Sequence, residues 1–183
     1  MSDYFYNTNN VVVDLETLGT KAGCVILSIG AAEFEDHGVV DAFYRTLSID
    51  SQTERGLKIE QRVLKFWLDQ DAETRGDIFE SDQEATDVLT DFSKWCNSKE
   101  NLVLWGNSAR FDLGILEQAY TCLGFHECMI PWDTRNGERC YKTLKKLYPE
   151  ITSERTGVLH NALDDACFQA EHLIKILKSI KKD

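Results

Sequence analysis

The chain has 183 residues, with 31 acidic residues against 20 Lys and Arg, which gives a formal net charge of −11. This length is typical of one domain, and the balance of 43% hydrophobic to 28% charged residues excludes a disordered chain. No apolar run reaches the ~20 residues that a membrane span needs. The N-terminal sequence MSDYFYNTNN lacks the basic start and apolar stretch of a secretory signal. We therefore expect a single domain over residues 1–183, located in the cytoplasm and with no membrane partner.

The acidic charge argues against a protein that coats nucleic acid by bulk charge, but it does not exclude an enzyme that acts on nucleic acid. Carboxylates that bind divalent cations raise the acid count, and the bound cations then supply positive charge. The six cysteines form no C-x-x-C pair, and several lie in apolar runs. We expect small buried side chains there, and neither a zinc site nor disulfides.

Three apolar runs in the first third of the chain predict strands. They cover residues 11–13, 24–34 and 39–49, and a turn sequence at 36–38 separates the last two. The first run is β-branched and continuous, which is typical of a strand buried on both faces. We expect an antiparallel meander with this first strand inside the sheet.

Helical periodicity dominates the rest of the chain. The predicted elements are, in order, a helix through Ile59 and Trp67, a helix capped by Asp82 and running to Cys96, a strand over 102–105, a helix over 111–123, a helix through Leu144 and Leu147, and a last helix capped by Asn161. Strands followed by interleaved helices and a further strand predict an α/β fold with a mixed sheet.

Two carboxylates follow the first predicted strand directly. Asp14 and Glu16 are two positions apart, so they point to the same face of that strand. They would repel each other unless a cation lies between them, and hard divalent cations prefer oxygen ligands. The same pattern is also typical of a strand end with two solvated acids.

Three further residues stand where helices begin. Asp112 opens the helix after the 102–105 strand, and His160 and Asp165 flank the start of the last helix. Acids are common in a first helical turn, so each residue alone has an ordinary structural explanation. Together, four carboxylates and one imidazole meet the needs of two-metal phosphodiester hydrolysis, in which a neutral histidine accepts a proton from water.

These residues lie in three ordered motifs: DLE (14–16), NSARFD (107–112) and HNALDD (160–165). The set resembles the motifs of the DEDDh 3′-5′ exonucleases. Segments from about residue 11 to residue 173 resemble their small subfamily of phage exonucleases and mycobacterial-type exoribonucleases. The resemblance implies a ribonuclease H-like α/β fold with a mixed sheet of five or six strands flanked by helices.

The resemblance also implies an activity, cofactors and residue roles. The enzyme would remove nucleoside 5′-monophosphates from a single-stranded DNA or RNA 3′ end, with His160 as the general base. Two divalent ions, Mg²⁺ or Mn²⁺, would be held by Asp14, Glu16, Asp112 and Asp165. Asp164 is expected to cap the last helix and not to bind metal.

Substrate contacts are expected from the residues around the motifs. The resemblance implies that Leu18, after Thr17, lies against the terminal base, and that Trp67 stacks on a base. Phe111 is a further candidate, and Asn107 is expected to fix the motif loop. Leu18 can equally be a half-packed turn residue, and an aromatic at helical spacing, such as Trp67, is more often a core residue.

Two questions stay open at this point. The motifs do not separate DNA from RNA, and a catalytically silent nucleic-acid-binding or scaffold domain could share the fold. The presence of all five motif residues favours the enzyme. Relatives of this size often pair, so we also expect a homodimer, located in a host cytoplasm if the gene belongs to a phage.

Overall fold

The computed structural model describes residues 8–76 and 78–180, so residues 1–7, which carry most of the N-terminal sequence considered above, lie outside it. The described residues form a five-stranded mixed sheet with the strand order β3-β2-β1-β4-β5. The strands are β1 (Asn9–Thr17), β2 (Ile26–Glu35), β3 (Gly38–Thr46), β4 (Leu102–Gly106) and β5 (Glu138–Cys140). This confirms the expected α/β fold and the antiparallel β1-β2-β3 meander.

Strand β1 lies at the centre of the sheet. It pairs antiparallel with β2 and parallel with β4, and every residue from Asn10 to Thr17 is buried. Its alternating side chains enter two separate apolar cores, with Val11 and Val13 in one and Val12 in the other. The acids at its C-terminal end are therefore held at the middle of the sheet.

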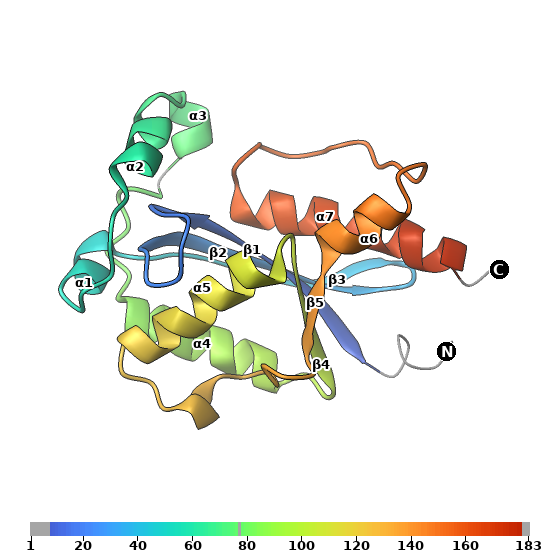
Figure 1. Ribbon diagram of the computed structural model, residues 1–183, viewed down its shortest axis with the longest axis horizontal. Coiled ribbons are helices and arrows are strands. Elements are labelled where there is room, and N and C mark those ends of the chain that lie inside the picture. The colour runs from blue at the N-terminus through green and yellow to red at the C-terminus, as the bar shows by residue number, and fades with distance from the viewer. Residues whose placement is uncertain (1–7, 77, 181–183) are drawn as a thin grey trace.

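Helices cover both faces of the sheet (Figure 1). The helices are α1 (Ile49–Thr53), α2 (Gln61–Leu68), α3 (Ala72–Arg75), α4 (Ala85–Asn97), α5 (Ala109–Cys122), α6 (Tyr141–Leu147) and α7 (Ala162–Ile180), with a short 3₁₀ turn, η1 (Glu127–Met129). Figure 1 shows α6 and α7 on one face, α4 and α5 on the other, and α1 to α3 at one end. No helix of the described residues is long and apolar enough to span a membrane.

Some local predictions were wrong. Helix α4 begins after Glu84 and not after Asp82. The Ser48 amide donates to the Gln83 carbonyl, and the Ala85 amide donates to the Ser51 hydroxyl. These hydrogen bonds hold the segment before α4 against α1. Strand β5 was not predicted, since three polar residues carry no strand periodicity. All six cysteines are free thiols, but only Cys24 and Cys96 are fully buried; Cys128 is exposed and the other three are half-buried.

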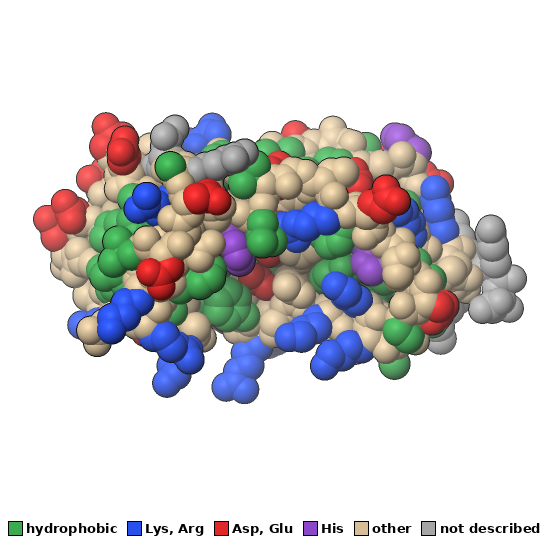
Figure 2. Space-filling view, turned by 90° about the horizontal axis from the view of Figure 1, so that it is seen from above, with side chains coloured by type: hydrophobic (Ala, Val, Ile, Leu, Met, Phe, Trp, Pro, Cys, Tyr) green, Lys and Arg blue, Asp and Glu red, His purple; other side chains and the backbone are tan. Residues whose placement is uncertain are grey.

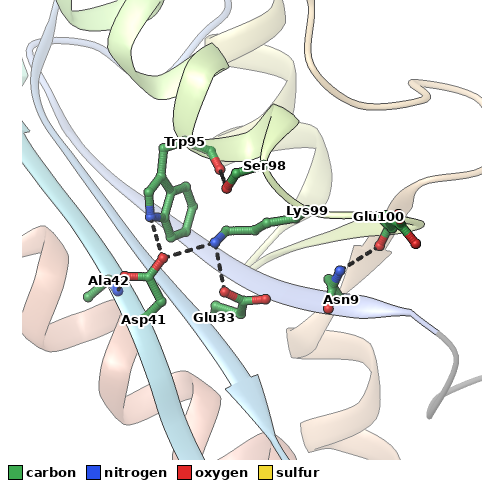
Figure 3. A network of polar contacts seen from close by, with 8 residues as sticks. All are labelled: Asn9, Glu33, Asp41, Ala42, Trp95, Ser98, Lys99 and Glu100. Atoms are coloured by element: carbon green, nitrogen blue, oxygen red, sulfur yellow. Dashed lines mark hydrogen bonds and ion pairs between the residues drawn. The ribbon is translucent and has the colours of Figure 1, made fainter.

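A nearly buried lysine ties the end of α4 to the sheet (Figure 3). Lys99 donates to Glu33 at 2.7 Å and to Asp41 at 2.9 Å, and its ammonium lies 4.1 Å from the centre of the Trp95 ring. The Trp95 indole N–H also donates to Asp41, at 2.7 Å. Because only 5% of the Lys99 side chain is exposed, removing it would leave the Glu33 carboxylate poorly solvated.

Replacing Lys99 with methionine is expected to lower the free energy of unfolding by about 2–4 kcal/mol, since one partner of a nearly buried ion pair is lost. Lys94→Met is the matched control, because Lys94 pairs with Asp91 at the surface, where the side chains are 71% and 50% exposed. The control should change stability by no more than about 0.5 kcal/mol. Urea denaturation measures both, and equal effects would contradict the structural role of Lys99.

A close backbone contact places α7 on the sheet. A Cβ atom at Gly30 would lie 2.1–2.3 Å from backbone atoms of Ala162 and Leu163 at the start of α7. Gly30 is also the β2 partner of Asp14. The absence of a side chain at this position therefore allows the first turn of α7 to approach the acids of β1.

Gly30→Ala is expected to destabilise the protein by about 3 kcal/mol, because backbone cannot move aside as a flexible side chain can. Turnover should fall further than stability explains, since the shifted helix carries Asp165. Gly114→Ala in the middle of α5 is the matched control, because its Cβ would meet nothing within 4 Å. The control should be neutral or stabilising by up to about 1 kcal/mol. Thermal unfolding measures the stability, and activity assays below the unfolding transition measure the turnover. A Gly30→Ala variant with wild-type stability and turnover would refute the close contact.

Candidate active site

One open cleft of about 800 Å³ collects all five motif residues. Asp14 and Glu16 reach it from the end of β1, and Asp112 comes from the first turn of α5. His160 precedes α7, and Asp165 lies in its first turn. Segments almost 150 residues apart in the chain thus meet at one edge of the central strands, as the motif spacing predicted.

Asp14 and Asp112 form the buried floor of the cleft. Asp14 is 8% exposed and Asp112 is 2% exposed. The side-chain amide of Gln169 donates to Asp14 Oδ1 at 2.7 Å, and the Ser108 amide donates to Asp112 Oδ2 at 3.1 Å. These donors hold both carboxylates in place but add no net positive charge.

The electrostatics of the cleft favour an added cation. Burial, together with the charge of Asp112, raises the pKa of Asp14 to about 8. Burial also raises the pKa of Glu16 to about 9, with contributions from Asp14 and Asp112, and it raises the pKa of Asp112 to about 7. At neutral pH, these carboxyls ionise together only if positive charge is supplied nearby.

His160 lies at the mouth of the cleft in an uncommon backbone conformation. Its φ angle of 63° is in the left-handed region, which costs a non-glycine residue about 1 kcal/mol or more. Its Nδ1 lies 4.0 Å from Glu16 Oε1, and its ring packs edge-on to Phe66 with 5.2 Å between centroids. Burial lowers the pKa of His160, as does the nearby Arg155, so the imidazole is neutral at pH 7.

The donor set fits a divalent cation. Glu16, His160 and Asp165 each place one potential ligand atom within 4.8 Å of the others. Carboxylate oxygens dominate the cleft, and hard divalent ions prefer such ligands. The Arg155 guanidinium forms an ion pair with Asp165, so this edge of the cluster already holds one positive charge.

Asp164, next to Asp165, binds backbone and not the cleft. Its Oδ2 accepts a hydrogen bond from the Val158 amide at 2.7 Å. Asn161 Oδ1 accepts from the amides of Leu163 and Asp164, which confirms it as the cap of α7. The two neighbouring carboxylates therefore point to different partners.

Two of the expected substrate contacts are almost completely buried, and of these two only Trp67 lines the cleft. Leu18 and Trp67 are each only 1% exposed. The Trp67 indole N–H donates to the Thr17 carbonyl at 3.0 Å, so the ring supports the loop after Glu16 from below. A ring buried this deeply presents little surface to the cleft, and the stacking of Trp67 on a base stays a prediction. Phe66 is the exposed aromatic of α2, with 41% of its surface accessible.

The other expected contacts do border the cleft. Thr17, Asn107 and Phe111 line it. The Thr17 hydroxyl donates to the Gly19 carbonyl at 2.7 Å. Asn107 is tied to α6 through its backbone, because its carbonyl accepts from the Lys142 amide at 3.0 Å.

Three features of the site were not predicted from the sequence. They are the hydrogen bond from Gln169 to Asp14, the ion pair of Arg155 with Asp165, and the exposure of Phe66. Gln169 follows Asp165 by four residues, so helical spacing could have placed both on one face. Arg155 lies in the irregular segment between α6 and α7, where no spacing rule applies.

Comparisons with known proteins agree with this architecture. The family model described as "3′-5′ exoribonuclease Rv2179c-like domain" matches residues 9–177. A search of curated proteins finds no match. Among solved structures, the nuclease domain of 3′hExo, a DEDDh family member bound to rAMP, is 12% identical with a TM-score of 0.64, covering 95% of this chain and 94% of that one.

Two other solved nucleases share the fold. Exonuclease X in complex with 5′ overhanging duplex DNA is 18% identical with a TM-score of 0.56, covering 93% of this chain and 92% of that one. The cell-death related nuclease 4, CRN-4, is 10% identical with a TM-score of 0.54, covering 96% of this chain and 64% of that one. At this level of identity, the three structures show that the fold is the same.

Proposed function

The chain belongs to the family of Rv2179c-like 3′-5′ exoribonuclease domains and is a 3′-5′ exonuclease, and we propose that it degrades single-stranded RNA, releasing nucleoside 5′-monophosphates one at a time. The convergence of four carboxylates and one neutral imidazole in a single open cleft carries this proposal. The family description favours RNA over DNA.

The four carboxylates would hold two divalent cations, Mg²⁺ or Mn²⁺. The ligands would be Asp14, Glu16, Asp112 and Asp165, which all line the cleft. When bound, such ions lower the pKa of the attacking water and stabilise charge on the leaving oxygen. Oxygen ligands favour these ions over Zn²⁺.

The protein side chains supply the base and the positioning. His160 is neutral at pH 7 and partly exposed, so its imidazole can accept the proton of the attacking water. Gln169 fixes the orientation of Asp14. Phe66 and Phe111 line the cleft and offer apolar surface to the terminal base, which is a sequence-tolerant way to bind a strand.

End-labelled RNA and DNA oligonucleotides, single- and double-stranded, test the proposal when incubated with Mg²⁺ or Mn²⁺ and resolved as ladders. We expect single-stranded RNA to shorten one nucleotide at a time from the 3′ end. A 3′-phosphate should slow or stop the reaction. Cleavage of a circular single strand, or faster hydrolysis of DNA than RNA, would contradict the proposed activity or substrate.

We also propose that two copies pair in solution. Helix α2 ends at Leu68, which is 62% exposed and does not line the cleft. A partner at this end would cover apolar surface and lengthen the substrate groove. Light scattering should then give the mass of a dimer at micromolar concentration, and a monomer would refute the pairing.

A further inference from the structure

A second cavity adjoins the active-site cleft. It has a volume of about 640 Å³, and it shares Asn107 and Lys142 with the cleft. Its walls come from α6, from the segment that follows it, and from α7. Because the two cavities adjoin, a strand whose 3′ end lies at the acids has this cavity as its neighbouring surface.

Three lysines of α6 line the cavity, which we call the lysine groove. Lys142, Lys145 and Lys146 are spaced i, i+3 and i+4, so they share one face of the helix, and all three are exposed. Within residues 8–76 and 78–180, none of them forms a salt bridge, and no Asp or Glu lines the groove.

This local charge is opposite to that of the whole molecule, whose net charge is −11. Figure 2 shows blue Lys and Arg side chains gathered along one edge of the face that also contains a hollow with red acidic atoms. Apart from a contact between the Lys145 ammonium and the Tyr141 ring at 5.8 Å, no charge contact within the part of the chain that the structure describes holds these lysines, and exposed charges contribute little to the stability of a fold. Their placement is more consistent with an anionic ligand.

An aromatic ring also lines the groove. Phe168 of α7 is half-buried there, and the Arg155 guanidinium lies 5.3 Å from the centre of its ring. Because Arg155 also pairs with Asp165, positive charge extends from the groove to the acid cluster. A cationic wall beside an aromatic ring is the usual construction of a site for single-stranded nucleic acid.

We propose that the lysine groove binds the phosphodiester backbone of the substrate strand upstream of the nucleotide being removed. This inference rests on the proposed function. Lys142, Lys145 and Lys146 contact successive phosphates, and Phe168 offers a face to one base. The groove holds the shortened strand after each hydrolysis, so it promotes the removal of several nucleotides in one encounter.

The test uses the full chain carrying Lys145→Gln and Lys146→Gln. Lys142 is left unchanged because it also lines the cleft. The matched control is Lys94→Gln with Lys178→Gln, which removes the same charge from positions that line neither cavity. Equal melting temperatures of the two variants and the wild type establish that folding is unaffected.

Two readouts distinguish the groove from the catalytic centre. For a 20-nucleotide RNA, we expect kcat/KM to fall at least about tenfold in the groove variant, with hydrolysis of a dinucleotide unchanged. In EDTA, where hydrolysis stops, binding of a labelled 20-nucleotide RNA can be measured at several salt concentrations. The slope of log Kobs against log[salt] should become shallower by about 1.4 in the groove variant, since it loses two phosphate contacts and each contributes about 0.7 for single strands.

Equal losses on both substrates, or no loss on either, would overturn the proposal. An unchanged salt slope in EDTA would also overturn it. If the wild type hydrolyses neither substrate, the proposed function is wrong, while the binding measurement in EDTA still reports on the groove independently.

Discussion

Replacing His160 with alanine is expected to lower turnover by about 10²–10⁴-fold, because a general base typically contributes that much. This corresponds to about 3–5 kcal/mol of barrier. Cation affinity and oligonucleotide affinity should survive, since all four carboxylates are untouched. Calorimetry with Mg²⁺ or Mn²⁺ and single-turnover kinetics separate these effects.

The pH dependence of the variant sharpens the test. Raising the pH should recover part of the lost rate, because hydroxide becomes available without the imidazole. His37→Ala is the matched control, since His37 lies in an exposed turn with 68% of its side chain accessible. A His160→Ala variant that hydrolyses 3′ ends at a near wild-type rate across the range from about pH 6 to 9 would exclude His160 as the base.

The metal-free protein is expected to lose stability as the pH rises from about 5 to 9. Folding raises the pKa of Asp14 to about 8 and that of Glu16 to about 9, so the folded chain holds protons that the unfolded chain releases. The contribution of these two carboxyl groups to stability is fully present below about pH 4, near their pKa values in the unfolded chain. It is lost as the pH rises through their raised pKa values in the folded chain. One such proton is worth about 1.4 kcal/mol per pH unit, or about 3–6 °C in melting temperature.

Divalent cations should reverse this loss, because they bind the ionised folded state. A concentration of 100 times Kd stabilises by about 2.7 kcal/mol. Asp14→Asn removes one of the repelling charges, so at pH 8 it should melt higher than the wild type in EDTA but gain less from added Mg²⁺. Glu171→Gln, at an exposed position of α7, should follow the wild type in both buffers. A wild-type melting temperature that is independent of both pH and Mg²⁺ would rule out the charged cluster as a cation site.

The sequence was sufficient for the parts of the site that local rules determine. The two-residue spacing of Asp14 and Glu16 follows from strand geometry, and the capping pattern around Asn161 located the start of α7. The ends of the central strands and the starts of the neighbouring helices meet at one edge of the sheet. Predicting these element boundaries was therefore enough to place the acids in one cleft.

Features that depend on distant contacts could not be predicted in this way. Trp67 and Phe66 are neighbours on one helix, and only the packing of α2 against Thr17, 50 positions away, decides which ring is buried. Arg155 reaches Asp165 from an irregular segment that has no periodicity. The role of Gly30 depends on a helix that begins more than 130 residues later.

The chain order of the site also has a consequence for biosynthesis. Asp14 is synthesised long before Asp165 and Gln169, which belong to α7. The central strand receives its parallel partner β4 only after residue 102 has been made, and α7 covers the sheet later still. A nascent chain that has not reached α7 therefore lacks His160 and one of the four carboxylates of the cleft. We therefore expect the enzyme to be inactive until α7 has been made, and truncated products that end before α7 to lack nuclease activity.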